Sequence, residues 1–231
     1  MPHTDEPDAV RSGEAFLALC RRRLRFKPTL ALAEHWAASF LRMPPGELPG
    51  FDPMDAAPLL PHVYILERDG DALRYRVSGE SVNDLFFSSH IGKTLSQVVP
   101  PAIYSLVAPY FFDVFDLKAC IFKGYVIHTG LRAAEFERLL LPVRRNGTLQ
   151  LLGLLSLSTT SAVRTDEAAP SAVEDGFHFT QIALTDGTIT ESHIPLHDLP
   201  VDDLPFKEHV RQHGPYDLTP EVARKGSETE C

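Results

Sequence analysis

The most constraining feature of this chain is a pair of β-rich runs within residues 62–79, HVYILERDGDALRYRVSG, joined by the short sequence DGD. An Asp-Gly pair between runs of alternating apolar residues favours a β-hairpin, because both residues tolerate positive φ. Gly79 closes the second run just before a helix-like segment. We expect Gly79 and the later Gly92 to lie at positive φ, or where the backbone closely approaches a neighbour.

The pattern on either side of this hairpin gives the order of the other elements. Apolar residues at helical spacing predict helices over 14–26, 31–43, 81–87 and 101–118. Runs rich in β-branched and aromatic residues predict strands over 121–129, 135–145 and 149–160. The chain therefore reads as helices, two strands, helices and three strands, which predicts an α+β fold.

Four short motifs accompany this order of elements: Phe51-Asp52-Pro53, Leu59-Leu60-Pro61-His62-Val63, Arg74-Tyr75-Arg76-Val77-Ser78-Gly79 and Ile91-Gly92-Lys93-Thr94-Leu95. With them, the chain resembles the PAS domain, a small sensory and interaction fold with a five-stranded antiparallel sheet and short helices on one face. The resemblance extends over about residues 30–162 and is closest to short stand-alone bacterial PAS-like proteins. We accordingly expect an N-terminal helical cap at 1–44, a PAS-like domain at 45–162 and an acidic C-terminal extension at 163–231.

Within the extension, residues 177–191 alternate in polarity around another Asp-Gly pair, which predicts a second hairpin. The N-terminal helices carry an apolar stripe that needs a partner. That partner is either the outer face of the sheet or the same stripe on a second subunit, because PAS domains often dimerise through N-terminal helices. The candidate residues for a dimer interface are Phe16, Leu17, Leu24, Trp36 and Phe40.

Composition limits the partners and the compartment. A net charge of −9 argues against nucleic acid or an anionic membrane as the main partner. The basic run at 21–27 is typical of a solvated helix face. No stretch approaches the ~18 apolar residues of a membrane span, and the polar N-terminus is unlike a signal peptide. The three cysteines, Cys20, Cys120 and Cys231, do not suggest a disulfide framework, so we expect a cytoplasmic protein.

A ligand pocket in the PAS-like core would be lined by aromatic and apolar side chains facing the sheet, for a small apolar or planar ligand. Close packing is the competing interpretation, because such residues usually fill a core. The pocket candidates are Phe86, Phe87, Tyr104, Phe111, Phe112, Phe115, Tyr125 and Ile127.

The resemblance disfavours two familiar PAS cofactors. Haem needs an axial histidine on the long helix, where none is present, since His90 and His128 lie outside it. A blue-light flavin site needs a reactive cysteine in a motif that Cys120 does not match. The cofactor therefore stays unknown, and Cys120 reads as a small buried apolar residue.

We expect a non-enzymatic sensory or protein-interaction module of bacterial signalling that acts through an unidentified partner protein, with a homodimer expected. Motifs for phosphate, dinucleotide, esterase and zinc-ribbon sites are missing. The alternative is a small metal-dependent enzyme, because two histidine pairs have i, i+4 spacing and acids lie close by. Those residues are His193, His197, His209, His213, Asp198, Asp202 and Asp203. Pro195 and the missing HExxH glutamate argue against that metal site.

Overall fold

The computed structural model describes residues 8–44, 46–85, 88–128, 132–157, 176–195 and 198. Its helices are α1 (Asp8–Arg23), α2 (Lys27–Phe40), α3 (Glu80–Leu85), α4 (Leu95–Val98) and α5 (Pro101–Phe112), with 3-10 turns η1 (Ala57–His62) and η2 (Asp113–Asp116). Its strands are β1 (Val63–Asp69), β2 (Ala72–Ser78), β3 (Lys118–His128), β4 (Arg132–Arg145), β5 (Thr148–Leu157), β6 (Gly176–Ala183) and β7 (Ile189–Pro195). None of the described helices is both long and apolar enough to cross a membrane.

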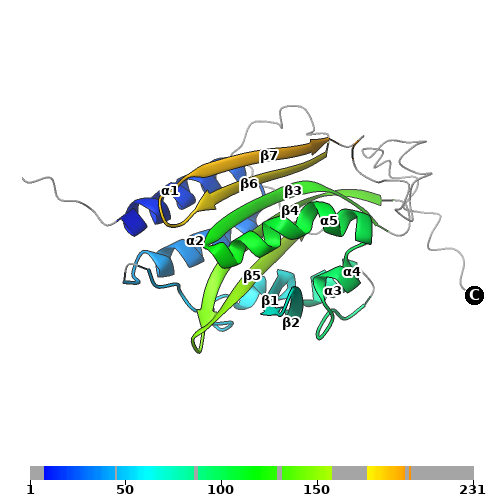
Figure 1. The fold of residues 1–231 in the computed structure, drawn as a ribbon, viewed down its shortest axis with the longest axis horizontal. Coiled ribbons are helices and arrows are strands. Elements are labelled where there is room, and N and C mark those ends of the chain that lie inside the picture. Colours follow the sequence, from blue (N-terminus) through cyan, green and yellow to red (C-terminus); the bar gives the residue numbers. More distant parts are fainter. Residues whose placement is uncertain are drawn as a thin grey trace, which may run out of the picture.

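The strands form one antiparallel sheet in the order β2-β1-β5-β4-β3-β6-β7 (Figure 1). The expected α+β fold is confirmed, but the sheet has seven strands where five were expected. The two additional strands are β6 and β7, which form the hairpin expected near 177–191. In a five-stranded sheet β3 would be an edge strand with unpaired backbone groups. Here β6 pairs with it from Lys118↔Ala183 to Lys123↔His178, and β7 becomes the edge.

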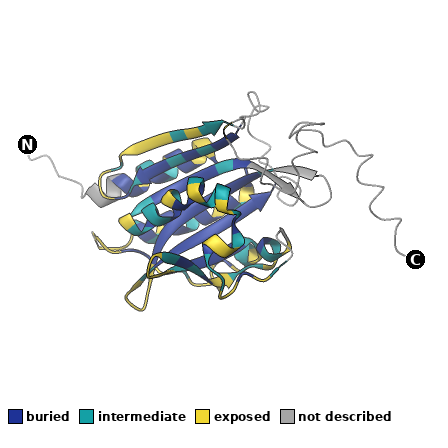
Figure 2. Cartoon of the chain, turned by 45° about the vertical axis from the view of Figure 1, so that its right-hand side comes forward, coloured by how far each residue is buried: buried dark blue, intermediate teal, exposed yellow. Residues whose placement is uncertain are grey.

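Helices cover both faces of the sheet, and each face has its own apolar core. Successive strand residues point to opposite faces, so Phe136 and Leu140 of β4 lie in the core beneath α5, whereas Leu139 and Leu141 lie in the core beneath α1 and α2. Figure 2 shows the central strands as the most buried part of the chain and β7 as largely exposed. The central strands therefore take part in both cores.

The N-terminal helices cap the sheet of their own chain. Phe16, Leu24, Trp36 and Phe40 are at most 7% exposed and belong to the core between these helices and the sheet. The indole Nε1 of Trp36 also donates to the carbonyl oxygen of Pro142 on β4 at 3.0 Å. Leu17 is partly buried against the same core. Side chains buried within one chain offer no surface to a second copy, which corrects the dimer-interface interpretation for the four buried residues.

The junction between α1 and α2 is held by a buried carboxyl group. Glu137 on β4 is 1% exposed and accepts hydrogen bonds from the backbone N–H groups of Arg25 at 2.7 Å and Phe26 at 3.2 Å. The ammonium group of Lys123, on the neighbouring strand, lies 3.6 Å from Glu137 and donates to the carbonyl oxygen of Arg23. Burial raises the pKa of Glu137, while Lys123 and the two amides oppose that shift. The cap is therefore attached through polar contacts as well as apolar packing.

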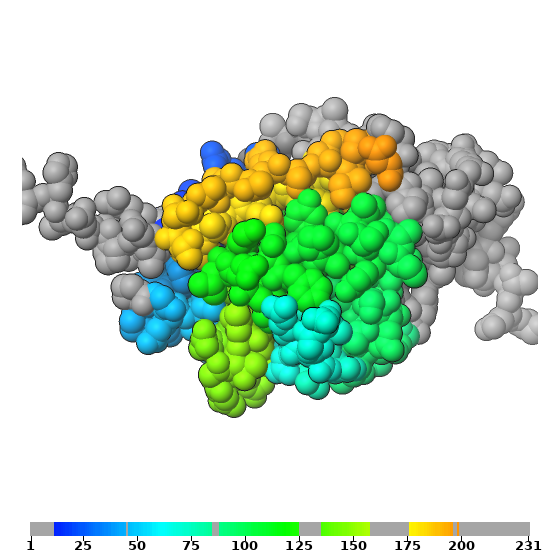
Figure 3. Space-filling view, viewed as in Figure 1, coloured from blue at the N-terminus to red at the C-terminus, as the bar shows by residue number. Residues whose placement is uncertain are grey.

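The β6–β7 hairpin contributes to both cores. Phe177 and Phe179 pack beneath α5, and Ile182 and Leu184 pack beneath the N-terminal helices. Phe179 stacks on Tyr110 of α5 with ring centroids 3.6 Å apart, and the Tyr110 hydroxyl hydrogen-bonds that of Ser192 at 2.7 Å. Figure 3 shows the hairpin lying alongside α5 on the visible face. The apolar core therefore extends across the boundary expected near residue 162.

One predicted helix is shorter than expected. The pattern predicts a helix over 101–118, but α5 ends at Phe112 and a single 3-10 turn follows it. Leu117 then adopts φ of 59°, in the left-handed region, and its carbonyl oxygen accepts from the backbone N–H of Leu184. This conformation ends the helical segment and directs the chain into β3.

The two glycines singled out in the sequence meet the expected constraints. Gly92 has a φ of +83°. At Gly79, between β2 and α3, an added Cβ atom would lie 2.2 Å from the carbonyl oxygen of Pro61 and 2.4 Å from that of Leu60. Both obstructing atoms belong to the backbone, so a side chain at residue 79 can be accommodated only if η1 moves.

Replacing Gly79 by alanine should therefore lower the free energy of unfolding by about 1–3 kcal/mol, the usual cost of overpacking. Chemical denaturation of the purified variant measures this loss. Gly50→Ala is the matched control, because its Cβ would lie 3.4 Å from the carbonyl oxygen of Arg144, at ordinary contact distance. Similar stabilities for the two variants would contradict the close approach at Gly79.

Candidate functional site

The pocket candidates named from the sequence are only partly within the described structure. Phe111 of α5 is fully buried in the core beneath that helix, and Tyr104, Phe112 and Phe115 are partly buried against the same core. Tyr125 and Ile127 belong to β3, but their side chains lie outside the described residues, as do Phe86 and Phe87 entirely. The described candidates therefore act as core residues on the α5 face of the sheet.

A buried arginine lies in this same core. Arg138 on β4 is 8% exposed. Its guanidinium carbon lies 5.8 Å from the ring centroids of Tyr64 and Phe111 and 5.9 Å from that of Phe136. Among the described residues, no carboxylate forms an ion pair with Arg138, and its Nε atom has no hydrogen-bond partner. Aromatic faces attract the guanidinium, but a buried charge normally also has a counter-charge.

Three neutral polar side chains complete what we call the Arg138 cluster, which consists of Tyr64, Tyr75, His90 and Arg138. The Tyr64 and Tyr75 rings are 5.8 Å apart, and the His90 ring lies 5.2 Å from Tyr75. Burial raises the pKa of Tyr64 although Arg138 opposes the shift, and burial raises the pKa of Tyr75 to about 12. Burial, with Lys93 and Arg138, lowers the pKa of His90 to about 4. At neutral pH Arg138 is therefore the charged member of the cluster.

This arrangement is suited to an acidic group that brings an apolar body with it. A guanidinium group presents a planar set of N–H donors that matches a carboxylate. Phe111 and Phe136 supply apolar surface next to that group, and the buried hydroxyl of Tyr64 lies beside the guanidinium group. The cluster offers one charged and one neutral donor inside an aromatic core.

Arg138 is not among the residues predicted from the sequence, although the sequence holds a signal for it. In the strand EFERLLLPV, Phe136, Arg138 and Leu140 occupy alternate positions and therefore share one face of the sheet. An arginine at an apolar position of such an alternation is a candidate for a buried charge. Tyr64, Tyr75 and His90 come from β1, β2 and the loop before α4, so only the folded chain brings them together.

The histidines proposed for a metal site are mostly outside the described structure. His193 lies on β7, where its ring stacks on that of His178, and Asp198 is exposed. His197, His209, His213, Asp202 and Asp203 lie outside the described residues. Within the described part of the chain, no group of three or more histidine, cysteine or acidic side chains is arranged to hold a metal ion.

The low pKa of His90 predicts how stability responds to acid. In the unfolded chain the imidazole takes up a proton near pH 6.5, but in the folded chain only near pH 4. Between these values the unfolded state binds more protons, so the free energy of unfolding falls as pH falls. The full difference is about 3 kcal/mol. Chemical denaturation at pH 7 and pH 4.5 should show this loss in the wild type and a smaller loss in His90→Gln.

His35→Gln, at a half-buried position on α2, is the control for His90→Gln. Denaturation of this variant at the same two pH values separates the effect of losing His90 from that of losing any histidine. Equal changes in stability with pH for the wild type and His90→Gln would contradict a neutral, buried imidazole at residue 90.

Comparison with known proteins agrees with this architecture. A family model described as PAS domain matches residues 25–156, more than half of the 231-residue chain. The match covers α2, the first five strands and the whole Arg138 cluster, and it ends before the β6–β7 hairpin. No curated protein sequence matches the chain. PAS domains are sensory or interaction modules, and this chain belongs to the PAS domain family.

Proposed function

We propose that this chain is a non-enzymatic sensory module of bacterial signalling that binds a small acidic ligand at the Arg138 cluster. The observation that carries the proposal is the buried guanidinium of Arg138, which has no carboxylate partner among the described residues. Taking an ion out of water costs several kcal/mol even after relaxation of the protein. A ligand carboxylate at this position would offset that cost.

The neighbouring residues support an acid with an apolar body. The rings of Tyr64, Phe111 and Phe136 lie around the guanidinium, each with its centroid within 6 Å of the central carbon. A carboxylate held by Arg138 would place the rest of the ligand against these rings. The proposed ligand is therefore the small apolar molecule expected from the sequence, with an acidic group in addition.

The signal is proposed to pass to a partner protein, as the interaction role of PAS domains suggests. A homodimer stays part of the proposal, with its contact surface outside the buried stripe of the N-terminal helices.

We also propose a reducing, cytoplasmic location. In support, Cys20 and Cys120 are free thiols buried in separate cores, where burial raises the pKa of each and keeps them unreactive.

Arg138→Met should abolish the preference for acids. Native mass spectrometry of freshly purified wild type should detect a retained small acid. In calorimetry with a panel of aromatic and aliphatic carboxylic acids, the best acid should bind at least about tenfold more tightly than its amide analogue, because ionic hydrogen bonds are roughly twice as strong as neutral ones. Arg138→Met should bind both analogues equally weakly.

Arg138→Met replaces the charged side chain with an apolar one of similar length. Replacing a buried charge in this way is often neutral or stabilising for the folded protein. Arg144→Met is the matched control, because Arg144 lies on the same strand, is exposed and donates to the carbonyl oxygen of Gly147. Acid binding that is unchanged in Arg138→Met would disprove the ligand role of Arg138. A loss of several kcal/mol of stability would instead assign Arg138 to the packing of the core.

A further inference from the structure

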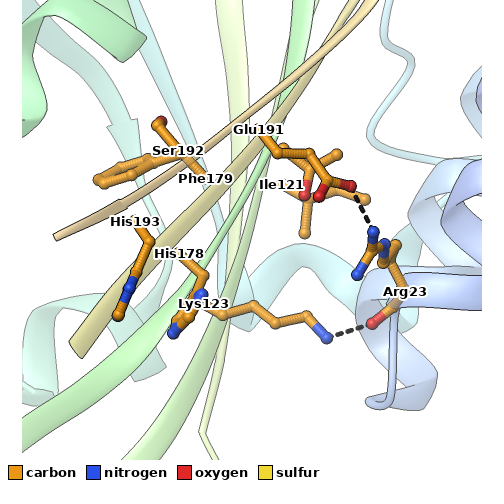
Figure 4. Close-up of a pocket in the computed structure, with 9 residues that line it drawn as sticks. Arg23, Ile121, Lys123, His178, Phe179, Glu191, Ser192 and His193 are labelled. Carbon is orange, nitrogen blue, oxygen red and sulfur yellow. Dashed lines mark hydrogen bonds and ion pairs between the residues drawn. The ribbon is translucent and has the colours of Figure 1, made fainter. Parts of the chain in front are cut away.

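A second site lies on the opposite face of the sheet, between the end of α1 and the β6–β7 hairpin. It is an open cavity of about 190 Å³ that we call the hairpin pocket (Figure 4). Its lining residues come from α1, β3, β6 and β7 and are Arg23, Ile121, Lys123, His178, Phe179, Thr180, Glu191, Ser192 and His193. Most of them lie outside residues 25–156, so the pocket is largely built by segments that the PAS family match does not cover.

The strand register places three basic side chains in one row of this pocket. Lys123 on β3 pairs with His178 on β6, and His178 pairs with His193 on β7. Directly opposed residues on adjacent antiparallel strands share a face of the sheet, about 5 Å apart. The imidazole rings of His178 and His193 are stacked, with centroids 4.0 Å apart and planes inclined by 16°. The row therefore consists of one ammonium group and two imidazole rings.

The two permanent cations near this row, Lys123 and Arg23, each lie against a carboxylate group. Lys123 lies 3.6 Å from Glu137 and donates to the carbonyl oxygen of Arg23. Arg23 forms an ion pair with Glu191, which spans the pocket from α1 to β7, as Figure 4 shows. Glu137 faces the α1–α2 junction, where it accepts hydrogen bonds from two backbone N–H groups. Neither carboxylate is directly opposite His178 or His193 in the register.

The geometry of the two imidazoles is unsuited to joint coordination of a metal. Imidazole lone pairs lie in the plane of the ring, and a zinc ion would need both nitrogen atoms within about 2.1 Å. In two nearly parallel rings 4.0 Å apart, the lone pairs run side by side and do not converge on one ion. Protonated imidazoles can instead present N–H donors to one extended acceptor.

We propose that the hairpin pocket binds a small oxyanion, or the carboxylate end of a larger molecule, between Lys123 and the stacked histidines. The cavity volume of about 190 Å³ is below the 300 Å³ or so of a typical organic-ligand pocket. An anion of a few heavy atoms fits this volume. Protonation of both rings places two like charges close together, and a bound anion offsets their repulsion.

Proton uptake by the pocket follows from this arrangement. An anion favours the charged form of each imidazole, so the bound state holds more protons than the free state near neutral pH. Protonation of either imidazole adds a positive charge beside the anion, so affinity should fall as pH rises. Arg23, Lys123 and Glu191 also line the pocket, and Glu137 lies 3.6 Å from the ammonium group of Lys123. The histidines therefore supply the pH dependence.

Sulfate is the probe that tests this proposal, because it remains a dianion from pH 6 to pH 8. The full chain, with labelled histidines, is titrated with sodium sulfate against sodium chloride at equal ionic strength, and the imidazole resonances are followed by NMR. We expect saturable shifts of His178 and His193 at pH 6, and a dissociation constant about tenfold larger at pH 8, the change for one linked proton over about one pH unit.

Two substitutions locate the site. His193→Gln changes an exposed residue of the edge strand and should abolish saturation while leaving the rest of the spectrum native. Arg23→Gln should weaken binding, whereas Arg22→Gln, one residue earlier and outside the pocket, should not. Shifts that do not saturate, saturation that survives in His193→Gln, or equal affinity at both pH values would overturn the proposal. Histidine shifts caused by zinc and not by sulfate would assign the pair to a metal instead.

Discussion

Glu137 joins the N-terminal helices to the sheet through a carboxyl group that is almost completely buried. The turn between α1 and α2 exposes backbone N–H groups that neither helix can satisfy. Glu137 accepts two of them, and a hydrogen bond to a charged group contributes about 1.5–3 kcal/mol. Without this acceptor, the N–H of Phe26 would be buried without a partner, at a cost of about 1–3 kcal/mol. The position of the helical cap depends on this contact.

The strand that carries Glu137 also carries Arg138. Adjacent residues of a strand point to opposite faces, so β4 presents its acid to the cap and its base to the core beneath α5. Lys123, opposite Glu137 on β3, continues the row of charged side chains to the hairpin pocket. Three polar features of the molecule, the cap junction, the Arg138 cluster and the hairpin pocket, are thus connected through two neighbouring central strands.

Local patterns predicted most elements of the fold. The DGD sequence marked the β1–β2 hairpin because Gly70, at φ of +61°, supplies the turn conformation, and alternation located β3, β4 and β5 to within a few residues. The end of α5 was not predicted because leucine seldom adopts the left-handed conformation that Leu117 has. In the folded chain, the carbonyl oxygen of Leu117 accepts a hydrogen bond from the backbone N–H of Leu184, far away in the sequence. Addition of β6 to β3 was missed for a related reason, since sheet order depends on pairing across a long separation in sequence.

The candidate site was less accessible from sequence than the fold. Phe111 was predicted as a ligand-pocket candidate and lies in the core beneath α5. The Arg138 cluster, by contrast, combines residues from three strands and a loop that share no motif. The local sequence pattern that indicates this cluster is the arginine at an apolar position of the alternation in β4.

The apolar stripe that contains Trp36 was predicted from the sequence, but the surface against which it packs was not. In the folded chain that surface is the sheet, where the indole N–H of Trp36 donates to the carbonyl oxygen of Pro142.

Hydrogen exchange at the Arg25 and Phe26 amides, measured together with the free energy of unfolding in Glu137→Gln, tests the central role of Glu137 most directly. Glu135→Gln is the control, because Glu135 lies on the same strand and pairs at 2.8 Å with the partly exposed side chain of Arg25. We predict that Glu137→Gln loses about 2 kcal/mol or more and exchanges both amides faster, whereas Glu135→Gln loses less than about 1 kcal/mol. Unchanged exchange and stability in Glu137→Gln would contradict this account.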